Sequence, residues 1–151
     1  MQLSARKDVD LPPEDLFDAV ADFDRLERMM IQRGAQVRRL APSAGIPMAW
    51  DIRFNWRGRQ RDLQMSVTQF DRPDLVGMTG ASESFDVQIR SEVVALSRTR
   101  SRLAMTIEVT PRTLKARLLL QTVRLTRTTI ERRFADSFAA FVDGLVAARR
   151  G

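Results

Sequence analysis

Cysteine, histidine and tyrosine are all missing from this sequence of 151 residues. Their absence excludes a thiol nucleophile, a zinc site built from cysteine and histidine, an imidazole base and a phenol acid. Catalysis would therefore depend on Asp, Glu, Ser, Thr, Lys, Arg or a cofactor. The carboxylates form no credible ligand cluster along the chain, so we expect neither a metal nor a cofactor.

Long apolar runs are missing as well. No stretch approaches the roughly 20 residues that a helix needs to cross a bilayer. The acidic residues Asp8 and Asp10 stand where a signal peptide would carry its apolar segment. The balance of apolar and charged residues is that of a globular protein. We therefore expect a single domain over residues 1–151, located in the cytoplasm.

The net charge of +6 is concentrated near the C-terminus. Residues 1–110 carry 16 basic and 16 acidic side chains, whereas residues 111–151 carry 9 basic and 3 acidic ones. A basic helix there favours a weak contact with an anionic membrane, although an arginine-rich solvated face is the simpler interpretation. Specific nucleic-acid binding is not expected, because the sequence has no helix-turn-helix, no RNA-recognition motif and no interleaved aromatic and basic residues.

Two short helices are predicted after an extended segment over residues 2–10. Pro12 and Pro13, followed by acidic residues, suit a first helical turn, where a missing N–H and negative charge are both favourable. A second helix is predicted from Phe23 to Arg33, with Gly34 as its C-terminal stop.

Alternating apolar and polar residues then predict a meander of antiparallel strands. Residues 50–56 alternate strictly, and a tight turn at residues 57–59 leads to a second alternating run over residues 62–68. Further strands are predicted at residues 37–40, 75–79, 84–96 and 103–109. The chain would thus form a sheet of about six or seven strands with one apolar face.

From Pro111 to Arg150 the apolar residues recur at helical spacing. One continuous helix of about 38 residues would be roughly 57 Å long at 1.5 Å per residue, which is longer than a domain of this size covers. We therefore expect a bend or break near residues 126–129, where β-branched threonines lower helix propensity.

This order of elements resembles the SRPBCC superfamily, also called START-like or helix-grip. The resemblance is carried by the run from Val9 to Phe17 (VDLPPEDLF), by Asp22-Phe23 shortly after it, and by Val109-Thr110-Pro111 before the last helical region. It implies an α+β fold in which a curved antiparallel sheet wraps a long C-terminal helix around an apolar pocket. Members include ligand carriers, polyketide cyclases, dehydratases and chaperone activators, so the resemblance alone does not choose a function.

Under this fold, the apolar side chains of the strands and of the facing helix would line a pocket for a lipid, a quinone or an aromatic molecule. Those residues are Trp50, Ile52, Phe54, Trp56, Leu63, Met65, Val67, Val87, Ile89, Met105, Ile107, Val123, Thr126, Ile130 and Phe134. The alternative is that the same residues fill a core, and the sequence does not separate the two.

Binding or carrying a small apolar molecule is the first functional hypothesis. A polyketide cyclase or dehydratase is the second, and an inward-facing carboxylate or arginine would distinguish it. The strand carboxylates Asp51, Asp62, Asp86, Glu92 and Glu108 all fall on the polar parity, which disfavours an enzyme and leaves no catalytic residue to name. The third hypothesis is an interaction module that uses the basic C-terminal helix.

Overall fold

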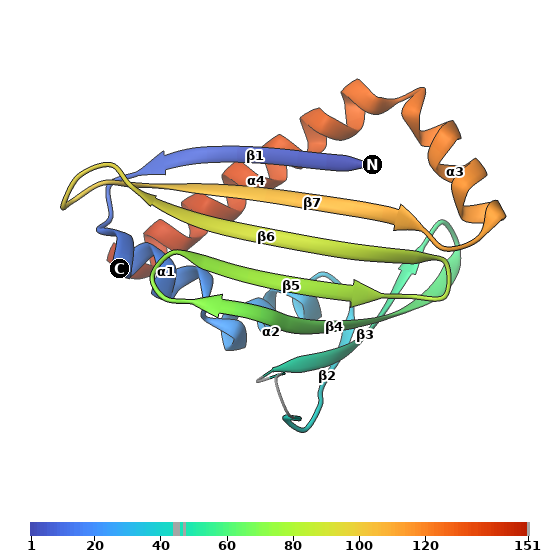
Figure 1. The fold of residues 1–151 in the computed structure, drawn as a ribbon, viewed down its shortest axis with the longest axis horizontal. Coiled ribbons are helices and arrows are strands. Elements are labelled where there is room, and N and C mark those ends of the chain that lie inside the picture. The colour runs from blue at the N-terminus through green and yellow to red at the C-terminus, as the bar shows by residue number, and fades with distance from the viewer. Residues whose placement is uncertain (44–45, 47, 151) are drawn as a thin grey trace.

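The computed structural model describes residues 1–43, 46 and 48–150 (Figure 1). In chain order the elements are β1 (Gln2–Val9), α1 (Pro13–Val20), α2 (Phe23–Gln32), β2 (Gln36–Arg39), β3 (Ala49–Trp56), β4 (Arg59–Asp71), β5 (Leu75–Ala81), β6 (Phe85–Ala95), β7 (Ser101–Pro111), α3 (Leu114–Arg124) and α4 (Arg127–Arg150). This order confirms the predicted succession of a strand, two short helices, a meander and a C-terminal helical region.

The strands form one seven-stranded antiparallel sheet in the order β1-β7-β6-β5-β4-β3-β2. In Figure 1, α1, α2 and α4 lie behind the sheet, and α3 lies beyond the far end of β7. Helix α4 packs on β1 and α1, while α3 approaches β7. The chain therefore has the α+β helix-grip arrangement that the sequence predicted.

The hairpin of β3 and β4 shows how the alternation produces one apolar face. Trp50 pairs with Met65 and Ile52 with Leu63, so all four side chains point to the same side of the sheet. Arg57 and Gly58 connect the strands with φ values of 52° and 72°, the left-handed pair that a tight two-residue hairpin turn requires. The predicted turn is confirmed, but β4 is longer than predicted at both ends.

Local sequence signals set the bounds of the two short helices. Pro12 precedes α1, and Glu14 and Asp15 occupy its first turn. Asp22 caps α2 by accepting a hydrogen bond from the backbone N–H of Arg25 at 3.1 Å. The helix ends just before Gly34, whose φ of 96° suits glycine and confirms the predicted stop.

The hydrophobic core lies between one face of the sheet and α1, α2 and the C-terminal half of α4. Its largest fully buried side chains include Phe17 on α1, Trp50 on β3, Leu103 on β7 and Leu145 on α4. We call the side of the sheet that bears Trp50 and Leu103 the inner face. No helix in the described part of the chain is both long enough and apolar enough to span a membrane.

The C-terminal region differs from the prediction at its start. Pro111 is the last residue of β7, paired with Phe85, and not the first turn of a helix. The ladder with β6 extends the strand to Pro111, and α3 begins three residues later with Thr113 as its cap, accepting from the N–H of Ala116 at 3.1 Å. The expected break is present: α3 ends at Arg124 and α4 begins at Arg127, directly beside the threonines at residues 126–129.

Candidate ligand-binding surface

Burial is uneven over the inner face. Met65 and Val67 on β4 and Leu103 on β7 are buried. Other side chains of the same parity are only partly buried and, among the described residues, do not belong to the core cluster, although Val87 lies in the same cross-strand row as Met65 and Ile107 in the same row as Val67. These residues are Leu3, Val87 and Ile107 from the sheet, with Ile130 and Phe134 from α4, and we call them the open half.

Strand register brings the sheet residues of the open half together. Ile107 lies between Leu3 and Ile89 in neighbouring strands, and Val87 pairs with Gly80. On the helix side, Phe134 stacks on the buried Phe138 with ring centroids 6.3 Å apart. The open half is therefore continuous with the core, although its side chains keep some exposure to solvent.

The predicted pocket residues divide between these two environments. The structure places Trp50, Ile52, Met65, Val67 and Val123 in buried positions. It leaves the others partly or largely exposed: Phe54, Trp56, Leu63, Val87, Ile89, Met105, Ile107, Ile130, Phe134 and Thr126. Thr126 lies in the break between α3 and α4, where its hydroxyl donates to the carbonyl of Val123 at 3.0 Å.

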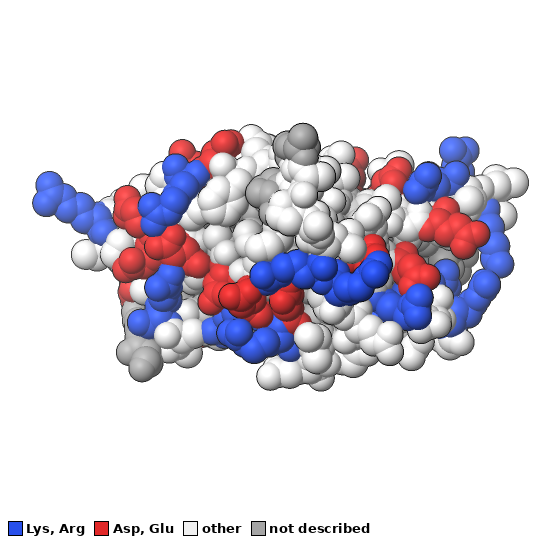
Figure 2. Space-filling model, turned by 90° about the horizontal axis from the view of Figure 1, so that it is seen from below, with Lys and Arg blue, Asp and Glu red and all other residues white. Residues whose placement is uncertain are grey.

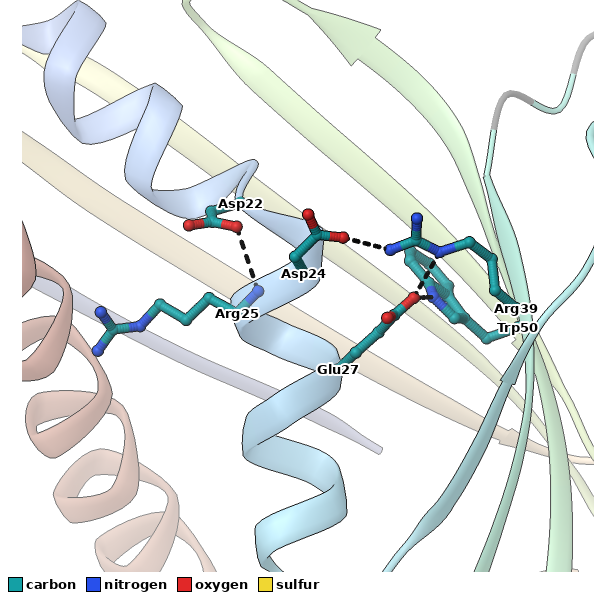
Figure 3. Close-up of polar contacts among 6 residues, drawn as sticks. All are labelled: Asp22, Asp24, Arg25, Glu27, Arg39 and Trp50. Carbon is teal, nitrogen blue, oxygen red and sulfur yellow. Dashed lines mark hydrogen bonds and ion pairs between the residues drawn. The ribbon is translucent and has the colours of Figure 1, made fainter.

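Trp50 shows why parity did not reveal this division. It is 1% exposed, and its ring meets that of Phe23 edge to face at a centroid distance of 5.6 Å. Figure 3 shows Glu27 of α2 reaching the indole of Trp50, with Arg39 and Asp24 beside it. Arg39 bonds Asp24 and Glu27 at 2.6 Å each, and these two hydrogen bonds raise the pKa of its guanidinium above the usual range.

Arg61 is a candidate functional residue that the sequence analysis missed. It pairs with Phe54 and therefore lies on the inner face, two residues before Leu63. Its guanidinium stands 5.3 Å from the ring centroid of Trp56, which is 39% exposed. Its Nε is buried and the structure shows no hydrogen-bond partner for it, an arrangement that costs free energy.

Extending the alternating pattern of the second strand toward its N-terminus would have placed Arg61 on the inner face. The second strand was predicted to begin at residue 62, whereas β4 begins at Arg59 and continues the same parity through Arg61 to Leu63. The charged side chain made this position look like part of the turn.

The strand carboxylates lie on the polar parity, as predicted. Asp51 pairs with Arg38 and Asp62 with Arg53 away from the inner face, and no carboxylate among the described residues of β3 to β7 shares the inner parity. Lys7 does share it, but its Nζ is 2.5 Å from Oδ1 of Asp143 on α4. Arg61 is therefore the partly buried inner-face cation of the described sheet for which the structure shows no anionic partner.

A separate half-open cleft of about 360 Å³ lies between α1, α2 and the end of α4. Around its polar lining, Arg72 donates three hydrogen bonds to Asp18, and Arg25 donates to the carbonyl of Gly144 at 2.9 Å, while the Nε of Arg25 is buried without a hydrogen-bond partner. Its apolar lining is small, so it suits a bulky hydrophobic ligand less well than the open half. The described residues contain no group of three or more side chains suited to a metal ion.

Comparison with known proteins gives the fold and nothing finer. No family model matches the sequence, and no curated protein matches it either. Solved structures do match: a protein from Thermus thermophilus has a TM-score of 0.71 and 10% identity, over 98% of this chain and 99% of that one.

Two further solved structures are enzymes by their descriptions. A point mutant of norcoclaurine synthase from Thalictrum flavum, in complex with a transition-state analogue, has a TM-score of 0.70 and 10% identity, over 100% of this chain and 96% of that one. The ZhuI aromatase/cyclase from Streptomyces sp. R1128 has a TM-score of 0.65 and 13% identity, over 99% and 93%. The structural neighbours of the chain are thus SRPBCC/START-like proteins, as the sequence resemblance predicted.

Proposed function

We propose that the protein binds a small hydrophobic molecule on the inner face of the sheet, over the open half. The observation that carries the proposal is the set of apolar side chains left partly exposed beside a well-buried core: Leu3, Val87, Ile107, Ile130 and Phe134. A ligand that covers them removes this apolar area from water, and burial of apolar surface stabilises a complex by about 25 cal/mol per Å². The SRPBCC/START-like fold of the neighbours supports the same hypothesis.

Arg61 supports a ligand that is amphipathic. The unpartnered Nε stands near the apolar Phe54 and Leu63 and beside the ring of Trp56. A carboxylate, sulfonate or carbonyl oxygen of the ligand would accept hydrogen bonds from the terminal N–H groups of the Arg61 guanidinium, and charge-assisted hydrogen bonds to arginine are among the strong ones. The ligand would then place its apolar body over the open half and its polar group at Arg61.

Native mass spectrometry of freshly purified protein, together with dye titration, tests the binding proposal. The fluorescence of the anionic dye 8-anilinonaphthalene-1-sulfonate should increase when it binds. Ile107→Asn should lower the affinity for the dye by about tenfold, because most of one apolar side chain no longer contributes to the contact. Val94→Asn, at an exposed position on the opposite side of β6, is the matched control and should leave binding unchanged. Equal affinities of the two variants would contradict the proposal.

The role of Arg61 is tested with two dyes that differ in charge. Arg61→Met keeps much of the length of the side chain but removes its charge and donors. It should lower the affinity for the anionic dye by about tenfold and change the affinity for uncharged N-phenyl-1-naphthylamine by less than about twofold. A parallel loss for both dyes would mean that Arg61 contributes packing only.

An enzyme is the second candidate function, and the inward position of Arg61 favours it. A guanidinium aimed at a bound carbonyl can stabilise the negative charge that develops on oxygen during condensation or cyclisation. The test is ring formation from a linear poly-β-carbonyl substrate, followed by mass spectrometry. The wild-type protein should accelerate it and Arg61→Met should not, and a rate equal to that in buffer would remove this alternative.

A further inference from the structure

Helix α3 carries an apolar stripe on the side that faces away from the protein. Leu114, Leu118 and Leu125 are 70%, 53% and 86% exposed. Leu125 is the C-cap residue of α3 and keeps helical dihedral angles, so at 100° per residue these three positions fall within about 40° of one another around the helix axis, with the exposed Gln121 beside them. Ala116 and Val123, the buried residues of α3, lie on the opposite side. The stripe is therefore not the packing face of the helix, and we call it the leucine stripe.

Cations flank the leucine stripe on both sides. Lys115 lies along one edge, and Arg117 and Arg124 lie along the other. The structure shows no side-chain partner for these three among the residues it describes, and the sequence has no acidic residue between residues 112 and 130. By contrast, the face seen in Figure 2 has acidic and basic side chains next to one another. Elsewhere in the structure Arg39, for example, pairs with Asp24 and Glu27.

We propose that α3 docks the protein on an anionic lipid surface, with the leucine stripe inserted among the acyl chains and the flanking cations at the headgroups. This is the pattern of an interfacial amphipathic helix, whose binding adds buried apolar area to attraction between cations and anionic lipids. The helix is already formed, capped by Thr113 and packed by Ala116 and Val123, so docking does not require a segment to fold.

The charge pattern disfavours the other occupants of such a stripe. In a symmetric dimer, the arginines at the edges of one stripe would face cations of the second copy, and like charges across an interface are unfavourable. A nucleic acid would satisfy the cations but would leave the three central leucines against phosphates and water. An anionic lipid surface satisfies both, and the proposal holds whether or not the open half binds a ligand.

Co-sedimentation with vesicles tests the docking. The wild-type protein should bind vesicles of phosphatidylcholine with about 30% phosphatidylglycerol at low salt, bind pure phosphatidylcholine about a hundredfold more weakly, and lose affinity as salt rises. Replacing Leu114, Leu118 and Leu125 with serine should lower the affinity by about tenfold or more, and Lys115→Gln, Arg117→Gln or Arg124→Gln should each lower it by about fivefold.

Two control variants distinguish docking through α3 from nonspecific association with vesicles. Leu96→Ser removes an exposed apolar side chain, and Arg98→Gln removes an exposed cation, both near the opposite end of the sheet from α3. Neither should change vesicle binding by more than about twofold, and circular dichroism should confirm that all variants stay folded. Binding that survives the triple serine substitution, or that is absent at low salt, would overturn the proposal. So would concentration-dependent dimerisation that depends on the leucines without vesicle binding.

Discussion

The indole Nε1–H of Trp50 donates a hydrogen bond to Oε1 of Glu27 across 2.5 Å, and the same oxygen accepts from Nε of Arg39 at 2.6 Å. A single carboxylate oxygen on α2 thus satisfies a buried donor from β3 and a cation from β2 (Figure 3). Because the tryptophan is almost fully buried, Glu27 holds α2 over this end of the sheet.

Removing that acceptor should destabilise the protein. Glu27→Ala leaves the buried indole N–H without a partner, which costs about 1–3 kcal/mol, whereas Glu27→Gln retains an acceptor and should cost less. The free energy of unfolding from urea titrations measures both. Asp24→Ala is the control, because Asp24 contacts Arg39 but not Trp50 and is largely exposed. This variant should lose less than about 1 kcal/mol of unfolding free energy. Equal losses for Glu27→Ala and Asp24→Ala would contradict the special role of the indole.

The division of the inner face into core and open half predicts different responses to one chemical change. Val67→Thr places a hydroxyl at a fully buried position and should cost about 1–3 kcal/mol, while Val87→Thr, at a partly buried position, should cost about half of that or less. Thermal and urea unfolding compare the two nearly isosteric variants. In dye titrations of the folded proteins the order should reverse, with Val87→Thr the more harmful. A larger loss of stability at Val87 would show that the open half is packed as core.

Period and turn chemistry predicted most of the fold, because they are local properties. The alternation at residues 50–56, the turn at Arg57 and Gly58, and the stop at Gly34 each depend on residues within a few positions of one another. Pro111 was placed wrongly because its local chemistry also fits the start of a helix. What keeps it in β7 is pairing with Phe85, far earlier in the chain, which no local pattern records.

The candidate site was less predictable for the same reason. Trp50 and Trp56 share one parity and one strand, yet Trp50 is buried and Trp56 is 39% exposed. The difference arises because α2 covers the Trp50 end of β3 and not the Trp56 end. Which end is covered depends on how the helices pack on the sheet. Alternation gives the face on which a residue lies, but not the element that covers it.

The N-terminal cap of α3 predicts a local loss of structure. Thr113 accepts from the N–H of Ala116 at 3.1 Å, and Thr113→Ala should destabilise the helix by about 1 kcal/mol. Because α3 buries few side chains, hydrogen exchange should accelerate mainly at residues 116–124 while β7 stays protected. Thr113→Ser keeps the hydroxyl and should exchange like the wild type. Uniform acceleration across the sheet would instead mean that α3 unfolds only with the whole protein.

The ion pair between β1 and β7 predicts a pH dependence. The hydrogen bond from Arg102, at 2.6 Å, holds the pKa of the Asp8 carboxyl below its ordinary value of 3.8. Since the folded pKa is the lower one, the pair adds stability above about pH 3.8, and this is lost as the pH falls through the folded pKa. Unfolding temperatures between about pH 2 and 6 should therefore fall less steeply for Asp8→Asn than for the wild type. Glu83→Gln removes an exposed carboxylate outside the strands as a control, and a slope for Asp8→Asn equal to that of the wild type would contradict this role for the pair.

The break after Arg124 also separates two segments that pack on the rest of the protein in different ways. In one continuous helix, every residue would share the geometry that α4 needs to pack on β1 and α1. With the break, α3 depends on the rest of the protein mainly through Ala116 and Val123. Substitutions of its outward residues can therefore change the charge or apolar character of this end of the protein without disturbing the core.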